Sequence, residues 1–109
     1  MNAWRTYITE QAEYDIRSIH EYIAHTLFAP DAAKRITSKL MDSIDRIEEL
    51  PKGCPILRKE PWHSRGVRRK NSGNFAIFYV ADDATEVVTI IRIMYSGRNV
   101  EEVLDGTLK

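Results

Sequence analysis

Residues 75–80 read FAIFYV, and this run is typical of the central strand of a β-sheet. Aromatic and β-branched residues favour strands, and an exposed edge of this composition would invite aggregation. Residues 67–70 precede it across a polar turn at 71–74, and residues 87–94 follow it across an acidic turn at 82–84. Turns of this composition commonly join antiparallel strands. The sequence therefore predicts a three-stranded antiparallel meander.

Upstream of the meander, apolar residues recur every three or four positions, which is the spacing of one helical face. The first helix follows Thr9, a natural N-cap residue, and is expected to continue to about His25. The second is expected to begin at Asp31, after the break at Pro30, and to end at Leu50. The two apolar stripes consist of Ala12, Ile16, Ile19 and Ile23, and of Ala33, Ile36, Leu40, Ile44 and Ile47. The short link between the helices predicts an antiparallel helical hairpin.

The two ends of the chain complete the predicted fold. Residues 4–8 alternate aromatic and β-branched residues and suit a strand. Residues 99–102 supply an N-cap residue and an acidic residue three positions later, which allows a short C-terminal helix. We expect a single α+β domain over 1–109, with an N-terminal strand and a helical hairpin packed on a mostly antiparallel four-stranded sheet.

Length and composition exclude several classes of protein. The chain has 109 residues, which suits one domain and excludes a multidomain enzyme. Its longest apolar run is far below the roughly 20 residues that a membrane span needs, and the N-terminus lacks a signal pattern. We therefore expect a soluble, cytoplasmic protein with no membrane partner. The single cysteine, Cys54, cannot form an intrachain disulfide, and the three histidines lack zinc spacing, so we expect no metal and no cofactor.

The net charge of zero conceals a segregation along the chain. Residues 1–51 carry a net charge of −3, residues 52–79 carry +6, and residues 80–109 carry −3. The basic middle segment is either a surface for a polyanionic or acidic partner or an ordinary solvated loop and strand face.

Five short motifs lie in a characteristic order along the chain. They are Ala12-x-x-Asp15-Ile16-x-x-Ile19-x-x-Tyr22-Ile23, Ile44-x-x-Ile47-x-x-Leu50-Pro51, Gly66-Val67-Arg68, Ala76-Ile77-Phe78-Tyr79 and Arg92-Ile93-x-Tyr95-x-x-Arg98. In this order and spacing, and with this length, the chain resembles the RelE/ParE superfamily of toxins from type II toxin-antitoxin systems. The resemblance implies the predicted fold and a cognate antitoxin as partner. The antitoxin is expected to bind as an extended segment with a helix, in an apolar groove across the two helices and the sheet.

The superfamily contains two activities, and the resemblance bears on which one applies. RelE-like members cleave messenger RNA in the ribosome, whereas ParE-like members inhibit DNA gyrase and are not nucleases. Arg68 and Arg98 match two basic positions of RelE-like proteins. The positions of a further arginine and of a C-terminal proton carrier fall near Phe75 and Leu104, which cannot move protons.

Residues 92–99 resemble the closing pattern of ParE, the plasmid-stabilisation type, with Tyr95 where ParE has histidine and Asn99 where it has aspartate. The leading hypothesis is therefore a ParE-like inhibitor that binds DNA gyrase. The first alternative is a ribosome-dependent endoribonuclease acting on mRNA, with Arg68 and Arg98 offsetting phosphate charge and His63 or Tyr95 carrying protons. The second is a toxin that has lost its toxicity and binds only its antitoxin. Both a homodimer and a toxin-antitoxin hetero-oligomer remain open.

The candidate binding residues are basic and belong to the middle segment and the chain's end. They are Arg65, Arg68, Arg69, Lys70 and Arg98. Alternation along a strand puts Arg68 and Lys70 on one face and Arg69 on the other. We expect Arg65, Arg68 and Arg98 to share a surface, and we expect Arg92, inside an apolar strand, to pair with a carboxylate or to project from the opposite face.

Overall fold

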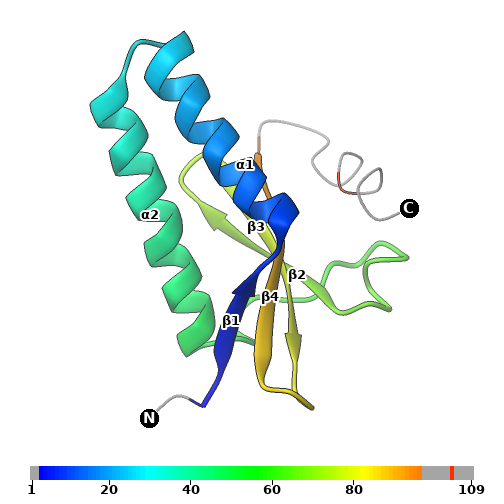
Figure 1. Cartoon of the computed structure of the whole chain (residues 1–109). Helices are drawn as coiled ribbons and strands as arrows, with labels where there is room; N and C mark the ends of the chain where they lie inside the picture. The colour runs from blue at the N-terminus through cyan, green and yellow to red at the C-terminus, as the bar shows by residue number, and fades with distance from the viewer. Residues whose placement is uncertain (1–2, 97–103, 105–109) are drawn as a thin grey trace.

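The structure is a computed structural model that describes residues 3–96 and residue 104. In this part of the chain, two α-helices form an antiparallel hairpin that covers one face of a four-stranded sheet (Figure 1). The elements in chain order are β1 (Arg5–Ile8), α1 (Glu10–Glu21), the π-helical turn η1 (Tyr22–Thr26), α2 (Pro30–Glu49), β2 (Val67–Ser72), β3 (Phe75–Asp82) and β4 (Val87–Tyr95). The predicted α+β fold is confirmed.

The sheet has the strand order β1-β4-β3-β2. β1 runs parallel to β4, and the pairs β3–β4 and β2–β3 are antiparallel. β3 therefore lies between two strands, as its continuous apolar sequence predicts. Side chains of β3 point alternately toward the helices and away from them. Both sets are buried, Ile77 and Tyr79 on the helical side and Ala76 and Phe78 on the other.

The strands of the meander are longer than the sequence predicts. β2 continues to Ser72 and pairs there with Phe75, so only Gly73 and Asn74 form the turn. Gly73 has a φ of 58°, in the left-handed region that favours glycine. The hydroxyl of Ser72 also hydrogen-bonds that of Ser43 on α2 at 2.7 Å, which ties this end of β2 to the helix.

The end of the first helix differs from the prediction. The α-helix ends at Glu21 instead of continuing to about His25, and the chain widens into η1. There the Leu27 backbone N–H donates to the Tyr22 carbonyl oxygen at 3.1 Å, a bond that spans five residues instead of four. α2 then begins at Pro30, one residue earlier than predicted, because proline suits the first position of a helix.

Two hydrophobic cores lie on the two faces of the sheet. The core under the helices contains Ala12, Leu40, Ile44, Ile47, Ile77, Tyr79, Val88, Ile90 and Ile93. The core on the outer face contains Trp62, Val67, Ala76, Phe78, Met94 and Leu104. Leu104 is fully buried, whereas the predicted helix at 99–102 lies outside the described residues. Among the helices described, none has the length and apolar composition to cross a membrane.

β1 is shorter than its neighbour β4. Beyond the end of β1, residues at the start of α1 hydrogen-bond the edge of β4 in its place. Pairing between the two strands ends at Ile8 and Ile90. The Thr9 backbone N–H and hydroxyl then both donate to the Ile90 carbonyl oxygen, at 3.2 and 2.9 Å. The same hydroxyl accepts from the Ala12 N–H at 3.1 Å, which confirms Thr9 as the N-cap.

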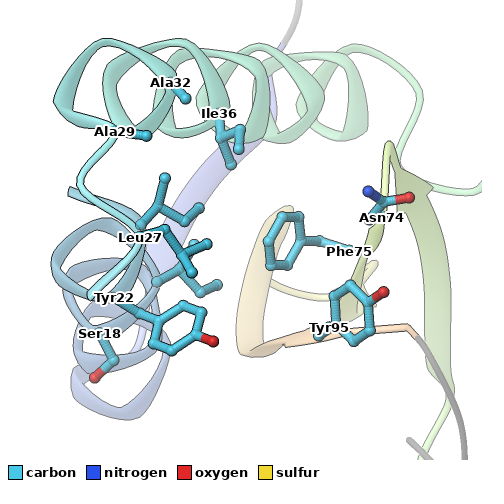
Figure 2. Close-up of a pocket in the computed structure, with 11 residues that line it drawn as sticks. Ser18, Tyr22, Leu27, Ala29, Ala32, Ile36, Asn74, Phe75 and Tyr95 are labelled. Carbon is cyan, nitrogen blue, oxygen red and sulfur yellow. The ribbon is translucent and has the colours of Figure 1, made fainter. Parts of the chain in front are cut away.

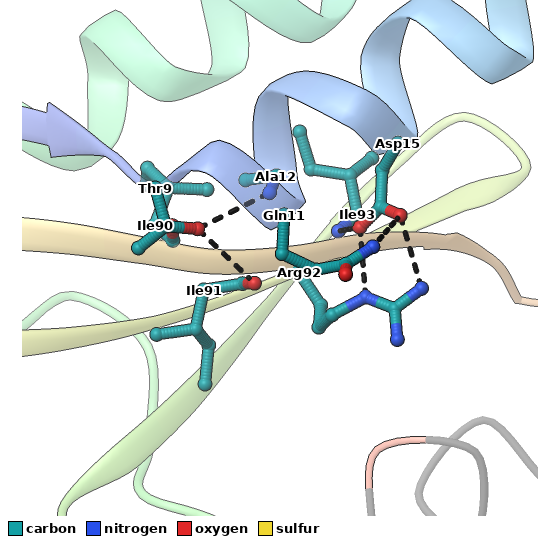
Figure 3. A network of polar contacts seen from close by, with 8 residues as sticks. All are labelled: Thr9, Gln11, Ala12, Asp15, Ile90, Ile91, Arg92 and Ile93. Carbon is teal, nitrogen blue, oxygen red and sulfur yellow. Dashed lines mark hydrogen bonds and ion pairs between the residues drawn. The ribbon is translucent and has the colours of Figure 1, made fainter. Parts of the chain in front are cut away.

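Asp15, six residues after Thr9 on α1, makes the next hydrogen bond to β4 (Figure 3). Its carboxylate accepts the Ile93 backbone N–H at 3.0 Å and the Arg92 Nε–H and Nη2–H at 2.8 and 3.0 Å. The Gln11 side-chain amide donates a further bond at 3.0 Å. A β-bulge at Ile91 shifts the register just before Arg92, and bulges commonly redirect a side chain. The expected pairing of Arg92 with a carboxylate is confirmed.

Removing the Asp15 carboxylate should strongly destabilise the fold. Asp15 is only 6% exposed, and truncating one partner of a buried ion pair costs about 3–5 kcal/mol because the other charge stays buried without compensation. We expect Asp15→Ala to lower the free energy of unfolding by this amount in urea denaturation. Asp42→Ala, at an exposed position of α2, is the matched control and should change it by less than about 0.5 kcal/mol. A similar loss in both variants would contradict this account.

Candidate functional surfaces

An apolar groove lies between the turn of the helical hairpin and one end of the sheet (Figure 2). Its volume is about 540 Å³. The lining residues are mostly apolar and come from both layers: Ser18, Ile19, Tyr22, Ile23, Leu27, Ala29, Ala32 and Ile36 on the helical side, and Asn74, Phe75 and Tyr95 on the sheet. The π-helical turn positions Tyr22 and Leu27 on the helical wall.

The rim of the groove exposes large apolar side chains. Tyr22, Leu27 and Tyr95 are each more than half exposed, and the neighbouring Phe28 is 87% exposed. The Tyr95 ring meets Phe75 edge to face, with centroids 6.0 Å apart. Clustered exposed apolar side chains of this kind commonly mark an interaction surface. An apolar groove across the two helices and the sheet is what the resemblance implies, whereas the residues that line it, Leu27 among them, were not predicted.

Two of the predicted basic residues lie on the outer face of the sheet. The Arg65 guanidinium lies over the Trp62 ring, 5.7 Å from its centroid, and the Arg69 guanidinium lies 5.9 Å from the centroid of Phe78. Arg69 Nε also donates to the Asn71 side-chain oxygen at 2.9 Å. Both rings belong to the outer core, so these two cations lie over the face that the helices leave uncovered.

Arg68 and Lys70 lie on the helical side, as strand alternation predicts. Arg68 Nη1 donates to the Cys54 carbonyl oxygen, and Lys70 lines a small cavity beside α2. The expectation that Arg65 and Arg68 share a surface is therefore wrong, because Arg65 packs on the outer core and Arg68 holds a loop beside the helical core. Arg98 lies outside the described residues.

The structure also separates the residues of the nuclease alternative. His63 lies in an exposed loop beside the outer core, where its Nδ1 donates to the Leu57 carbonyl oxygen at 3.0 Å. Arg68 pairs with Tyr79 in the sheet, whereas Tyr95 pairs with Phe75. Tyr79 and Phe75 are four positions apart on β3, so the two pairs lie about 13 Å apart along the strand. Tyr95 faces the apolar groove, and His63 and Arg68 lie toward the other end of the sheet.

The two positions to which the resemblance assigns a charged and a protic group of RelE-like proteins are filled here by packed apolar side chains. Phe75 packs against the core under the helices, and Leu104 is fully buried in the outer core. Over the described ranges, no three His, Cys, Asp or Glu side chains gather closely enough to hold a metal ion.

Solved structures of several toxins share this fold. The structure of a chromosomal ParDE toxin-antitoxin system from P. aeruginosa is similar with a TM-score of 0.71 and 16% identity, over 87% of this chain and 98% of that one. The isolated RelE toxin of E. coli has a TM-score of 0.60 and 17% identity, over 97% and 100% of the two chains. The archaeal RelE-RelB complex from Pyrococcus horikoshii has a TM-score of 0.60 and 17% identity, over 90% and 99%. These similarities define a RelE/ParE-like fold.

The sequence itself assigns the family within this fold. Residues 7–100 match the family described as the ParE toxin of the type II toxin-antitoxin system parDE. No curated protein matches the chain. The chain belongs to the ParE toxin family of type II toxin-antitoxin systems.

The two arginines at 65 and 68 should differ in what they contribute to stability. A hydrogen bond from a charged donor contributes about 2 kcal/mol, so Arg68→Ala should lower the free energy of unfolding by about this amount by releasing the Cys54 carbonyl. Arg65 is exposed over Trp62, and Arg65→Ala should cost less than about 1 kcal/mol. Chemical denaturation of the two variants measures this difference. Equal losses would show that Arg68 has no structural role.

Proposed function

We propose that this protein is a toxin that inhibits growth by binding DNA gyrase and that a cognate antitoxin neutralises it. The match to the ParE toxin family over residues 7–100 is the observation that carries the proposal. The protein acts by binding and needs no cofactor for this activity.

The chemistry of RNA cleavage supports gyrase over the ribosome as the target. Cleavage at an internal phosphodiester needs a base for the 2′-hydroxyl, positive charge around the transition state, and an acid for the leaving oxygen. Phe75 and Leu104 supply none of these, and Tyr95 lies about 13 Å along the sheet from Arg68. A ribosome-dependent endoribonuclease is therefore the weaker alternative.

The outer face of the sheet is the surface we assign to the target. Arg65 and Arg69 are held there on aromatic rings, and such preorganised cations lose little side-chain entropy when they bind an acidic surface. Arg98 is a further candidate for binding the target, because the resemblance to the RelE/ParE superfamily marks it as a functional residue. Arg68 and Lys70 face the helical side, and we assign Arg68 to stabilising the fold.

The apolar groove is the surface we assign to the antitoxin. The similar solved structures include a ParDE toxin-antitoxin system and a RelE-RelB complex. A groove of about 540 Å³ with exposed Leu27, Tyr22 and Tyr95 fits the apolar face of an amphipathic helix. Basic residues near the bound segment would meet antitoxin acids, so the affinity should fall as salt increases.

Purified protein should inhibit gyrase and should leave messages intact. We expect loss of supercoiling of relaxed plasmid by gyrase, weakened in the Arg65→Ala, Arg69→Ala double variant and unchanged in Lys39→Ala, an exposed control on α2. A programmed ribosome carrying a defined message should show no toxin-dependent cut. Message cleavage that Arg98→Ala abolishes would overturn the gyrase proposal, and so would inactivity of the folded parent protein in both assays.

A charge in the groove should release the antitoxin without removing toxicity. The partner to be tested is the product of the open reading frame that neighbours this gene. Leu27→Glu should weaken its binding at least tenfold, or about 1.4 kcal/mol, because a carboxylate would be buried against apolar side chains. Calorimetry at two salt concentrations measures the affinity, and growth during coexpression measures neutralisation.

Leu50→Glu is the matched control, because Leu50 is 71% exposed at the opposite end of α2. It should bind the antitoxin like the parent protein. Equal affinity of Leu27→Glu and the parent would place the antitoxin elsewhere on the molecule. Failure of the parent to bind the neighbouring product would remove the support for this antitoxin.

A further inference from the structure

A second cavity lies at the C-terminal end of α2, at the opposite end of this helix from the groove. Its volume is about 310 Å³, near the lower limit for pockets that hold small molecules. The polar groups that line it belong to Arg46, Glu49, Cys54, Lys70 and Tyr79. The proposed toxin activity uses none of these five residues.

The Tyr79 hydroxyl is an unused hydrogen-bond donor at this cavity. Tyr79 is fully buried, and in the described part of the chain its hydroxyl has no hydrogen-bond partner. Buried hydroxyls nearly always have one. Burial, and then the neighbouring Cys54 thiol, raise the pKa of the Tyr79 hydroxyl. It therefore stays protonated at neutral pH and can donate toward the Cys54 side.

Cys54 combines partial exposure with a mostly cationic environment. Its thiol is free and its residue is half-buried. Arg46 and Lys70 line the cavity with it, and Arg68 binds its carbonyl oxygen. The opposing charges are the Glu49 carboxylate and the α2 C-terminus, which is equivalent to about half a negative charge. These mostly cationic surroundings suit a reagent that carries negative charge.

We propose that Cys54 is a site of reversible thiol modification by a small anionic disulfide. The Cys54 thiol loses its proton to solvent, and the thiolate attacks one sulfur of the disulfide. A new S–S bond forms to Cys54 while the S–S bond of the reagent breaks. The departing thiolate keeps the electron pair and takes a proton from solvent. The carboxylates of the attached group lie toward Arg46 and Lys70, and the Tyr79 hydroxyl donates to the sulfur.

Intact-mass spectrometry during incubation with oxidised glutathione tests this proposal. The native protein should form one adduct, reversed by dithiothreitol, and should react faster than the same protein unfolded in urea. Cys54→Ser should form none. A native rate equal to or below the unfolded rate would overturn the proposal, because it would show that the cavity gives the thiol no advantage.

Three variants separate the roles of the neighbouring groups. Lys70→Ala should lower the rate with oxidised glutathione about threefold, the effect of one partly exposed charge, and should lower the rate with neutral hydroxyethyl disulfide by less. Lys39→Ala should leave both rates unchanged. Tyr79→Phe, checked for folding by circular dichroism, should lower both rates. Identical rates for Lys70→Ala and Lys39→Ala, or a faster reaction in Tyr79→Phe, would contradict the assignment.

Discussion

The Asp15 carboxylate is the constraint on which the arrangement of this fold depends. β1 ends opposite Ile90, so the rest of β4 has a free edge on that side. Asp15 accepts the Ile93 backbone N–H of this edge and also binds the Arg92 guanidinium. A buried carboxylate is costly unless its bonds are satisfied, and here the strand, an arginine and Gln11 satisfy it. The helical hairpin is thereby held at one position on the sheet.

The position of the hairpin decides where the functional surfaces lie. With α1 held along β4, the π-helical turn lies above the end of the sheet and closes the groove against Phe75 and Tyr95 (Figure 2). The other face of the sheet carries Arg65 and Arg69 on its aromatic core. If the antitoxin and the target bind these separate surfaces, they do not compete for the same residues. The antitoxin would then act by changing the toxin's conformation or by sterically blocking the target.

Much of the fold follows from local patterns in the sequence. The apolar run at 75–80 predicts the central strand, and Thr9 predicts the start of α1. The isolated charge of Arg92 predicts either a carboxylate partner or a side chain on the opposite face, and the structure shows the first. Each of these signals is either a pattern within a few residues or the free-energy cost of burying an unpaired charge, which any fold must avoid. The fold was therefore predictable to the level of layers and strand order within the meander.

The surfaces were less predictable, because they depend on contacts between distant segments. The end of α1 depends on an extra-wide turn that tertiary packing stabilises, and no periodicity signals it. Arg65 and Arg68 are three residues apart, yet Trp62 draws one to the outer core while the Cys54 carbonyl holds the other on the helical side. The position of Asp15 opposite Ile93, 78 residues away, is likewise visible only in the folded chain.

The most direct test of the account is hydrogen exchange at the Ile93 amide, measured by NMR under native conditions. This amide has a carboxylate in place of a strand as its partner. If Asp15 holds the hairpin on the sheet, the amide should exchange only on global unfolding, with the protection of the buried amides of β3. Exchange as fast as at an open strand edge would show that Asp15 does not fix the two layers together.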